Sequence, residues 1–471
     1  MNRSRRLSLL ASALLAVAPS ALFAASVDSP EYQQKLEEAK KVVADWNSLP
    51  PEQIHADPSA ADWPGAVPAD AVRLKQQRFD LNTDFPRWRG KNDRVTTGFY
   101  APAGEVITVE VPESFAKLGV QVRIGCHSDN ANKKSVAKRF PFSISKAWPL
   151  NAGVTKVASP FGGTVYLEVP KEVTGKTIPV RFSGVVQQPW FVLGKTSPTE
   201  WREKIRNYPG PFAEMSCGPL TLSVPSADVR KLEDPTALMT FYKKGMACVQ
   251  ELSGPPVPVV ERIVYDVSIS AGSMHSGYPV MAGSKRKEAT DLAALENGLW
   301  GFFHEMGHNQ QWGGWSPPGQ GETTCNLFPL YVMSQVQAKK PKHPWKFDRS
   351  VLAKPLERGA IGTNLNGNHA LSIAFWIQLI NGIGWEPVKK TINEYHAKDA
   401  PEAPKGAEPI WDRLMLTLSK NSRRDLTPFF KAWGAEFSPA GEEAVKKLRL
   451  PSYLPDDAPG QPKAAQDTGS I

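Results

Sequence analysis

The spacing of apolar and polar positions changes along the chain and divides it into a strand-rich part and a helix-rich part. From Ser29 to Trp46 apolar residues recur every three or four positions, which predicts one amphipathic helix. A Pro-, Ala- and Asp-rich segment follows through about Pro68 and is typical of a linker. Thereafter short alternating or apolar runs predict strands at residues 105–111, 119–124, 163–169 and 177–182. We therefore expect a β-sandwich between residues 86 and 195.

Helical spacing dominates after Pro198. Helices are predicted to begin at Thr199 and Asp234, and one strand is predicted over residues 262–269. Later helices are predicted over residues 369–381, 385–396, 410–419 and 426–433. The prediction is an α+β multidomain chain with these parts: a signal peptide (1–25), an N-terminal helix and linker (26–85), a β-sandwich (86–195), a mainly helical domain (196–455) and a Pro-, Ala- and Gly-rich disordered tail (456–471).

One further predicted helix contains the stretch Gly301–Gln311 and carries the candidate chemistry. His304 and His308 are four positions apart, so both imidazoles project from one helix face, as two ligands of a tetrahedral zinc require. Glu305 is placed to take a proton from a water that the metal activates. Asn297 is a candidate N-cap for this helix. Since only 8 of 471 residues are His, chance predicts on the order of 0.01 such patterns in the chain, and we interpret this one as a metal site.

A catalytic zinc needs a third protein ligand, and the sequence offers two candidates. Glu322 begins a second apolar helix after the Gly-rich loop 313–319, which would let that helix fold back toward the metal. Cys325 competes with it, but it lies off the helix face of Glu322. Two His plus Glu is a known catalytic zinc set, so we expect Glu322 and one zinc per chain. Pro329 should kink this second helix one turn after its ligand.

The N-terminus has the features of a secretion signal. Three arginines in the first six residues precede an apolar run from Leu7 to Phe23, with a cleavage region at Ala24–Ala25. This predicts export to the periplasm or out of the cell. No other stretch approaches a membrane-spanning length. The formal net charge of +9 favours a plain solvated surface over attraction to anionic surfaces or glycans, and we find no nucleic-acid motif.

The chain contains four cysteines, Cys126, Cys217, Cys248 and Cys325. Export permits disulfides, and Cys217–Cys248 is the most plausible pair because both residues fall within one predicted domain. Four cysteines allow three full pairings, and the sequence does not choose among them.

Several separated stretches together resemble the enhancin-like, mucin-degrading zinc metallopeptidases, a branch of the two-His-plus-Glu gluzincins. The resemblance runs from about residue 95 to 455 and rests on these stretches: Thr97–Gly104, Phe161–Tyr166, Asp266–Ile269, Met274–Pro279, His304–Asn309, Glu322 with Asn326–Phe328, Asn421–Leu426 and Phe429–Gly434. It implies that residues 196–455 form a gluzincin-type zinc metallopeptidase domain. It also implies a secreted endopeptidase whose substrate is often an O-glycosylated, mucin-like protein.

Such chemistry needs a donor for the oxyanion that forms when water attacks the peptide carbonyl. The candidates for this role or for substrate contact are Tyr278, His369 and His275, each of which also has an ordinary packing role as its alternative. Trp312 and Trp315 flank two glycines beside the metal, where they would stack on substrate or fix the loop to the core. Candidates for orienting the ligands or binding substrate are Asn309, Gln310, Gln311 and Asn326.

Three functions follow from these patterns. The first is an exported zinc endopeptidase for O-glycosylated proteins. The second is a zinc peptidase for non-glycosylated proteins or cell-wall peptides. The third, from a different class, is a glycoprotein-binding or adhesion protein with a vestigial site, and the intact His304, Glu305, His308 and Glu322 argue against it.

Overall fold

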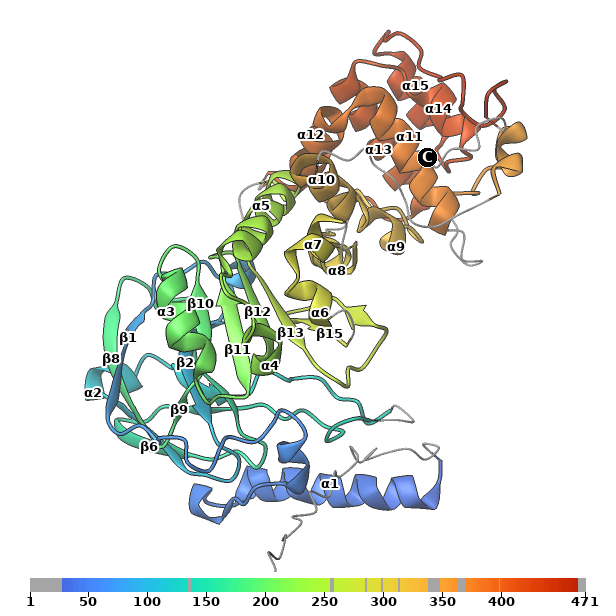
Figure 1. The fold of residues 1–471 in the computed structure, drawn as a ribbon. Coiled ribbons are helices and arrows are strands. Elements are labelled where there is room, and N and C mark those ends of the chain that lie inside the picture. The colour runs from blue at the N-terminus through green and yellow to red at the C-terminus, as the bar shows by residue number, and fades with distance from the viewer. Residues whose placement is uncertain are drawn as a thin grey trace, which may run out of the picture.

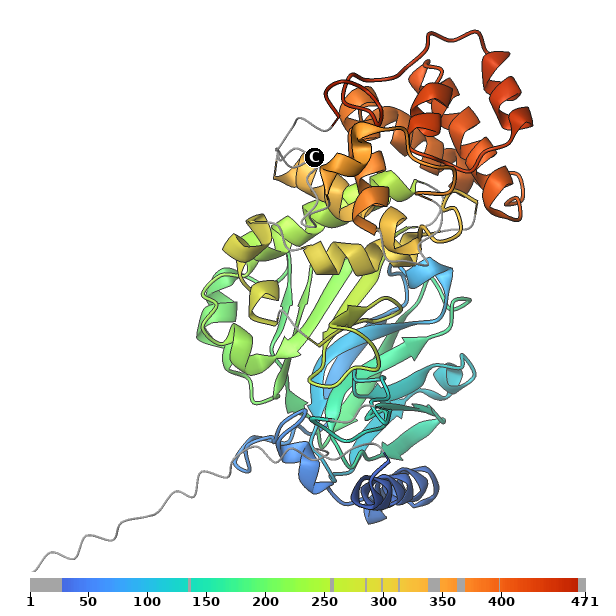
Figure 2. The same cartoon turned by 90° about the vertical axis from the view of Figure 1, so that its right-hand side faces the viewer.

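The computed structural model describes residues 28–133, 137–254, 258–283, 286–297, 300–311, 314–337, 348–361, 369–397 and 399–464. The predicted signal peptide lies outside these residues. The molecule is elongated, with the N-terminal helix at one end, a group of C-terminal helices at the other and the sheets between them (Figures 1 and 2). None of the described helices combines the length and the apolar character needed to cross a bilayer.

The predicted N-terminal helix is present as α1 (Pro30–Ser48), where Ser29 caps the helix by accepting a hydrogen bond from the Tyr32 N–H. A β-sandwich follows. Its elements are β1 (Gln77–Asn82), β2 (Asp93–Ala101), β3 (Ile107–Val111), α2 (Glu113–Ala116), β4 (Gln121–Ile124), β5 (Lys146–Pro149), β6 (Gly153–Val157), β7 (Gly163–Val169), β8 (Thr177–Ser183) and β9 (Val186–Gln187).

The sandwich consists of a four-stranded sheet, in the order β1-β8-β3-β6, and a five-stranded sheet, in the order β5-β4-β7-β2-β9. Inward-facing residues such as Val109, Val122, Leu167 and Val180 form one buried cluster between the sheets. The four predicted strands are β3, β4, β7 and β8. Strand β1 lies before residue 86, the predicted start of the sandwich. The sequence does not predict this strand, because its side chains are mostly exposed and its apolar alternation is weak.

A third sheet of six strands belongs to the second half of the chain. Its strands are β10 (Trp190–Val192), β11 (Phe212–Ser216), β12 (Leu220–Pro225), β13 (Glu261–Tyr265), β14 (Met274–His275) and β15 (Val280–Ala282), in the order β10-β11-β12-β13-β15-β14. Neighbouring residues of β13 point to opposite faces of this sheet. Ile263 packs in the buried cluster that contains the helices, and Val264 packs in the buried cluster on the sandwich side. The sheet is therefore covered on both faces, and β14 lies at its edge.

The second half of the chain also contains these helices: α3 (Pro198–Glu203), α4 (Ser226–Val229), α5 (Thr236–Ser253), α6 (Arg286–Ala289), α7 (Leu292–Glu296), α8 (Trp300–Gln310), α9 (Gly321–Thr324), α10 (Leu327–Val336), α11 (His369–Ile383), α12 (Trp385–His396), α13 (Ala407–Ser422), α14 (Thr427–Ala432) and α15 (Pro439–Lys446). Helices α5 and α8 pack on the face of the sheet that is turned away from the sandwich, whereas α11–α15 belong to the group at the far end of the molecule (Figure 1). The α+β multidomain class is confirmed, although the second domain contains a larger sheet than its helical spacing predicts.

Two predictions about the ends and crosslinks of the chain are wrong. Residues 456–464 are not a disordered tail, because Ala458 and Ala464 are fully buried and the Gly460 N–H donates to the Leu352 carbonyl at 2.8 Å. The rest of the predicted tail, residues 465–471, lies outside the described residues. The predicted disulfide is also absent: Cys217 and Cys248 are free and buried, the first in the turn between β11 and β12 and the second on α5.

Candidate metal centre

Helix α8 presents His304 and His308 on one side and packs Phe303 and Met306 into the core on the other. The two His side chains are 15% and 19% exposed, so both are largely buried but can be reached from solvent. Asn297 does not begin this helix. It is the C-cap of α7, because Asp291 caps a separate short helix immediately upstream.

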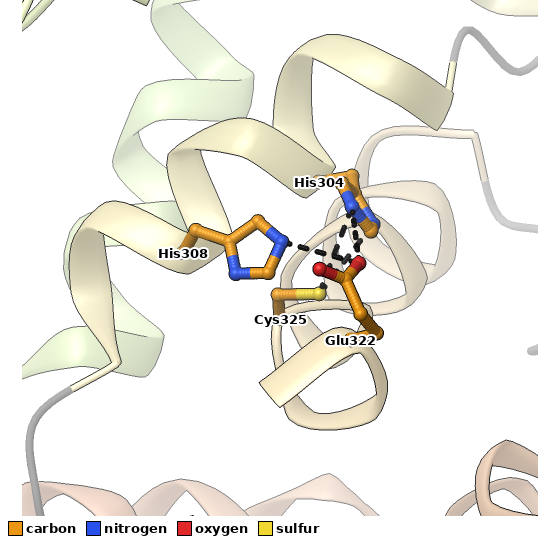
Figure 3. Close-up of side chains that lie close together, drawn as sticks. All are labelled: His304, His308, Glu322 and Cys325. Carbon is orange, nitrogen blue, oxygen red and sulfur yellow. Dashed lines mark hydrogen bonds and ion pairs between the residues drawn. The ribbon is translucent and has the colours of Figure 1, made fainter. Parts of the chain in front are cut away.

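Glu322, on α9, faces both histidines (Figure 3). Its Oε2 atom lies 3.4 Å from Nε2 of His304 and 3.4 Å from Nε2 of His308. These distances are long for hydrogen bonds. They match the edges of a tetrahedron with metal–ligand bonds of about 2.0–2.1 Å, whose ligands lie about 3.3–3.4 Å apart. Two imidazoles and one carboxylate in this arrangement fit a catalytic zinc, with the fourth position left for water or substrate.

Two carboxamides fix the outer nitrogens of the histidines. Asn326 Oδ1 lies 2.6 Å from Nδ1 of His304, and Gln311 Oε1 lies 2.9 Å from Nδ1 of His308. Because each amide oxygen accepts a hydrogen bond, Nδ1 carries the proton in both rings and Nε2 keeps its lone pair for a metal. The same amides donate to the chain around Glu322: Asn326 to the carbonyl of Glu322 and Gln311 to the carbonyl of Gly321.

The close approach of α8 to the second segment depends on Gly307. A Cβ atom at this position would lie 2.2 Å from the Cys325 carbonyl oxygen, so any other residue would push the two segments apart. The chain turns at Cys325 and Asn326, and α10 begins at Leu327. Pro329 is therefore in the first turn of α10, where a helix lacks internal partners for its N–H groups. The predicted kink of a single helix is wrong, because there are two helices.

Cys325 is the fourth member of the group of possible ligands, whose ligand atoms lie within 4.8 Å of one another. Its Sγ atom is 3.4 Å from Nδ1 of His304 and 3.9 Å from Nε2. The thiol thus lies nearer the nitrogen that faces away from Glu322 (Figure 3). Burial raises the pKa of this thiol well above its ordinary value. The geometry favours Glu322 over Cys325 as the third ligand.

Glu305 lies on the same helix, next to the first His, and is only 8% exposed. Burial raises the pKa of its carboxyl, and the neighbouring His304 and His308 partly oppose that shift. A buried carboxylate with a raised pKa is suited to accept and then release a proton during one reaction cycle.

The three candidate oxyanion donors lie in different places. The Tyr278 hydroxyl donates to Asp93 Oδ1 at 2.8 Å, and its ring stacks on Trp88, so this hydroxyl is turned toward the sandwich. His275 belongs to the edge strand β14 and contacts Asp129, and Glu305 is among the charges that raise its pKa. His369 is the first residue of α11, which packs against α9.

The other candidate residues hold the site together. Asn309 exchanges two hydrogen bonds of 2.9 Å with the backbone of Gly277 and donates to Glu261, which also accepts from Gln310. The Trp315 side chain is fully buried, and its indole N–H donates to Nε2 of His396 at 3.0 Å, so it fixes the loop to the core. Trp312 lies outside the described residues.

Two carboxylates of the sandwich, Asp93 and Asp129, were missed by sequence reasoning. Both contact the segment from His275 to Tyr278, although they lie more than 140 positions away in the sequence. No local pattern marks either residue, because their partners are set only by the packing of the sandwich on the six-stranded sheet.

Comparison with known proteins gives two family matches that together cover residues 70–434. Residues 70–183 match the N-terminal domain of M60-like peptidases, and residues 184–434 match the family described as peptidase M60, enhancin and enhancin-like. Human TRPM8 channel-associated factor 2 is 35% identical over 358 residues, which are 73% of this chain and 38% of that protein. A homologue of these factors from Danio rerio is 34% identical over 369 residues, 76% of this chain and 40% of that protein. The chain thus spans about two fifths of these relatives.

Solved structures share the fold at lower sequence identity. A functionally unknown conserved protein from Bacillus anthracis matches with a TM-score of 0.66 and 22% identity, over 81% of this chain and 80% of that one. IMPa from Pseudomonas aeruginosa, in complex with an O-glycopeptide, matches with a TM-score of 0.62 and 16% identity, over 86% of this chain and 54% of that one. The catalytic module of the metalloprotease ZmpA from Clostridium perfringens matches with a TM-score of 0.60 and 15% identity, over 81% of this chain and 80% of that one. This chain belongs to the peptidase M60, enhancin and enhancin-like family.

Proposed function

We propose that this protein is an exported, zinc-dependent endopeptidase that cleaves peptide bonds in O-glycosylated proteins. The observation that carries the proposal is the meeting of two imidazole nitrogens and one carboxylate oxygen, with Glu305 on the same helix. The export part rests on the basic and apolar N-terminal sequence.

His304, His308 and Glu322 would hold the zinc, and Asn326 and Gln311 would keep both rings in the ligating tautomer. The bound ion would supply a Lewis acid that polarises the substrate carbonyl and makes water more acidic. Glu305 takes the proton of the attacking water and passes it to the amide nitrogen that leaves. Its burial favours this exchange, because the protonated form costs no buried charge.

The preference for O-glycosylated substrates has support from structural neighbours. IMPa has been solved with an O-glycopeptide and with T-antigen, and it shares this fold at 16% identity. A site that binds a sugar hydrogen-bonds its hydroxyls, and leaving such groups unpaired costs about 1–3 kcal/mol each. Removal of the glycan should therefore reduce cleavage of the same peptide by tenfold or more.

The alternative is a binding protein with an inactive site. The names of the curated relatives favour it, since they describe channel-associated factors and name no enzyme. The complete set of His304, Glu305, His308 and Glu322 favours the peptidase.

Incubation of the purified protein with mucin, with mucin stripped of O-glycans and with casein separates these functions. A synthetic glycopeptide and the same peptide without its sugar give the quantitative comparison, and the Glu305→Gln variant controls for contaminating proteases. We expect cleavage of mucin and of the glycopeptide. Equal rates on the two peptides would reject glycan dependence, and no cleavage by zinc-loaded protein would reject the peptidase.

A further inference from the structure

His275 is surrounded by hydrogen-bond acceptors on both sides of its ring. Its Nε2 atom lies 2.8 Å from Oδ2 of Asp129, and its Nδ1 atom lies 2.9 Å from the carbonyl oxygen of Ser276. Nε2 also lies 3.3 Å from the hydroxyl oxygen of Ser270, which can accept as well as donate. A carboxylate and a carbonyl only accept hydrogen bonds, so protons on both ring nitrogens satisfy all of these contacts. The geometry therefore describes an imidazolium. Hydrogen bonding to Asp129 also raises the pKa of His275, which favours the protonated ring.

Asp129 belongs to the N-terminal domain, in the loop between β4 and β5, and this loop is anchored to the peptidase domain. Arg139, from the same loop, forms an ion pair with Asp266 in which both side chains are fully buried. The same guanidinium donates to the backbone carbonyl of Asp129 at 2.9 Å. The Asp129 carboxylate also accepts from the Ser270 N–H at 2.6 Å. Arg139 and Ser270 thus fix the backbone and the carboxylate of Asp129.

The segment that carries His275 is fixed to the metal helix as well. Asn309, one residue after His308, holds both backbone groups of Gly277, two residues after His275. The hydrogen bond and charge of the Asp129 carboxylate raise the pKa of His275, and the Glu305 carboxylate of α8 adds to this shift. The His275 side chain is 26% exposed, and its strand β14 contacts α8, the helix that carries the two histidines.

We propose that Asp129 is a positioning residue for catalysis, and that it holds His275 as a fixed positive charge beside the metal site. Both ring N–H groups are already engaged, so His275 acts through its charge and does not donate to the oxyanion directly. Negative charge develops on the substrate carbonyl oxygen during attack by water, and a fixed cation nearby stabilises it without reorganisation. The N-terminal domain thereby contributes to the reaction chemistry of the peptidase domain. This inference rests on the proposed peptidase function.

The kinetic test compares Asp129→Asn, His275→Gln and the double variant in the full zinc-loaded chain. We expect each single variant to lower kcat on the glycopeptide by about tenfold while KM changes less than twofold. The double variant should match His275→Gln, because the two residues act as one unit. Glu105→Gln is the matched control: it breaks the ion pair of Glu105 with Arg73 in the same domain and should leave kcat unchanged.

Measurement of zinc content, melting temperature and histidine NMR titration completes the test. The His275 signal, assigned by its loss in His275→Gln, should titrate above the ordinary value of about 6.5 in the wild type and fall in Asp129→Asn. A neutral His275, an unchanged kcat, or a loss of activity that follows lost zinc or a lower melting temperature would overturn the inference. A wild type that cleaves no substrate would refute the proposed function instead, while the NMR titration would still decide the state of His275.

Discussion

The amide oxygen of Asn326 lies 2.6 Å from Nδ1 of His304, and the amide nitrogen of the same residue donates to the carbonyl of Glu322 at 2.7 Å. One side chain thus sets the tautomer of one proposed ligand and the backbone position of another. Asn326 also accepts from the indole N–H of Trp300 at 2.7 Å, and its side chain is fully buried. These contacts make Asn326 part of the candidate metal site although it is not a proposed ligand.

Replacement of Asn326 by Ala should weaken zinc binding by about 10- to 100-fold, because the His304 ring would lose the hydrogen bond that orients it. Competition with a zinc chelator of known affinity measures this change directly. Asn297→Ala is a suitable control, since Asn297 is an exposed amide at the end of α7. An affinity equal to that of the wild type would show that the two backbone segments alone position His304.

Replacement of Glu305 by Gln should leave zinc content unchanged and lower kcat by about 10²- to 10⁴-fold, because an amide cannot accept the proton of the attacking water. Steady-state cleavage of the glycopeptide, with zinc content measured on the same sample, checks both parts. The exposed carboxylate Glu443 provides the control Glu443→Gln, which should behave as wild type. Activity of Glu305→Gln near the wild-type level would remove Glu305 as the general base.

Replacement of His304 by Ala should abolish stoichiometric zinc, since the two remaining ligands leave the ion weakly held. Glu322→Gln should also lose the metal, whereas Cys325→Ser should keep it if the thiol is not a ligand. Metal analysis after dialysis distinguishes the three variants. One zinc per chain in Glu322→Gln together with its loss in Cys325→Ser would reverse the choice of third ligand.

Much of the site follows from sequence spacing because its central residues are close together along the chain. The four-residue interval of His304 and His308 needs only a helix to bring both rings to one face. Glu322 is fourteen positions further on, across a Gly-containing loop, and α9 indeed brings it to both rings. The strands of the sandwich were also predictable, because apolar and polar residues alternate along β3 and β8.

The remaining features depend on tertiary packing that leaves no local pattern. Strand β11 is buried on both faces, so it shows no alternation, and β14 has only two residues. Asp129 and Asp93 become recognisable only when the sandwich packs on the six-stranded sheet. Pro329 would kink the helix only if α9 and α10 were continuous. The chain turns at Cys325 between them, so Pro329 lies in the first turn of a new helix.

A buried carboxyl group behind the metal helix leads to a last prediction, on stability. Glu261 is 1% exposed, and its two oxygens accept hydrogen bonds from Asn309 at 2.9 Å and Gln310 at 3.1 Å. Burial raises the pKa of this carboxyl from 4.5 to about 8, more than these two amides lower it. At neutral pH the folded protein therefore holds Glu261 in its neutral form.

In the unfolded chain the Glu261 carboxyl ionises near 4.5, whereas in the folded protein it ionises at about 8. Between these values unfolding releases a proton, so rising pH favours the unfolded state. The stabilising contribution is complete below about pH 4.5 and is lost as pH rises to about 8, a change of a few kcal/mol. Melting temperatures measured from pH 5 to 8 should fall more steeply for the wild type than for Glu261→Gln, which stays neutral throughout. Parallel curves for the two proteins would show that Glu261 is already ionised in the folded state.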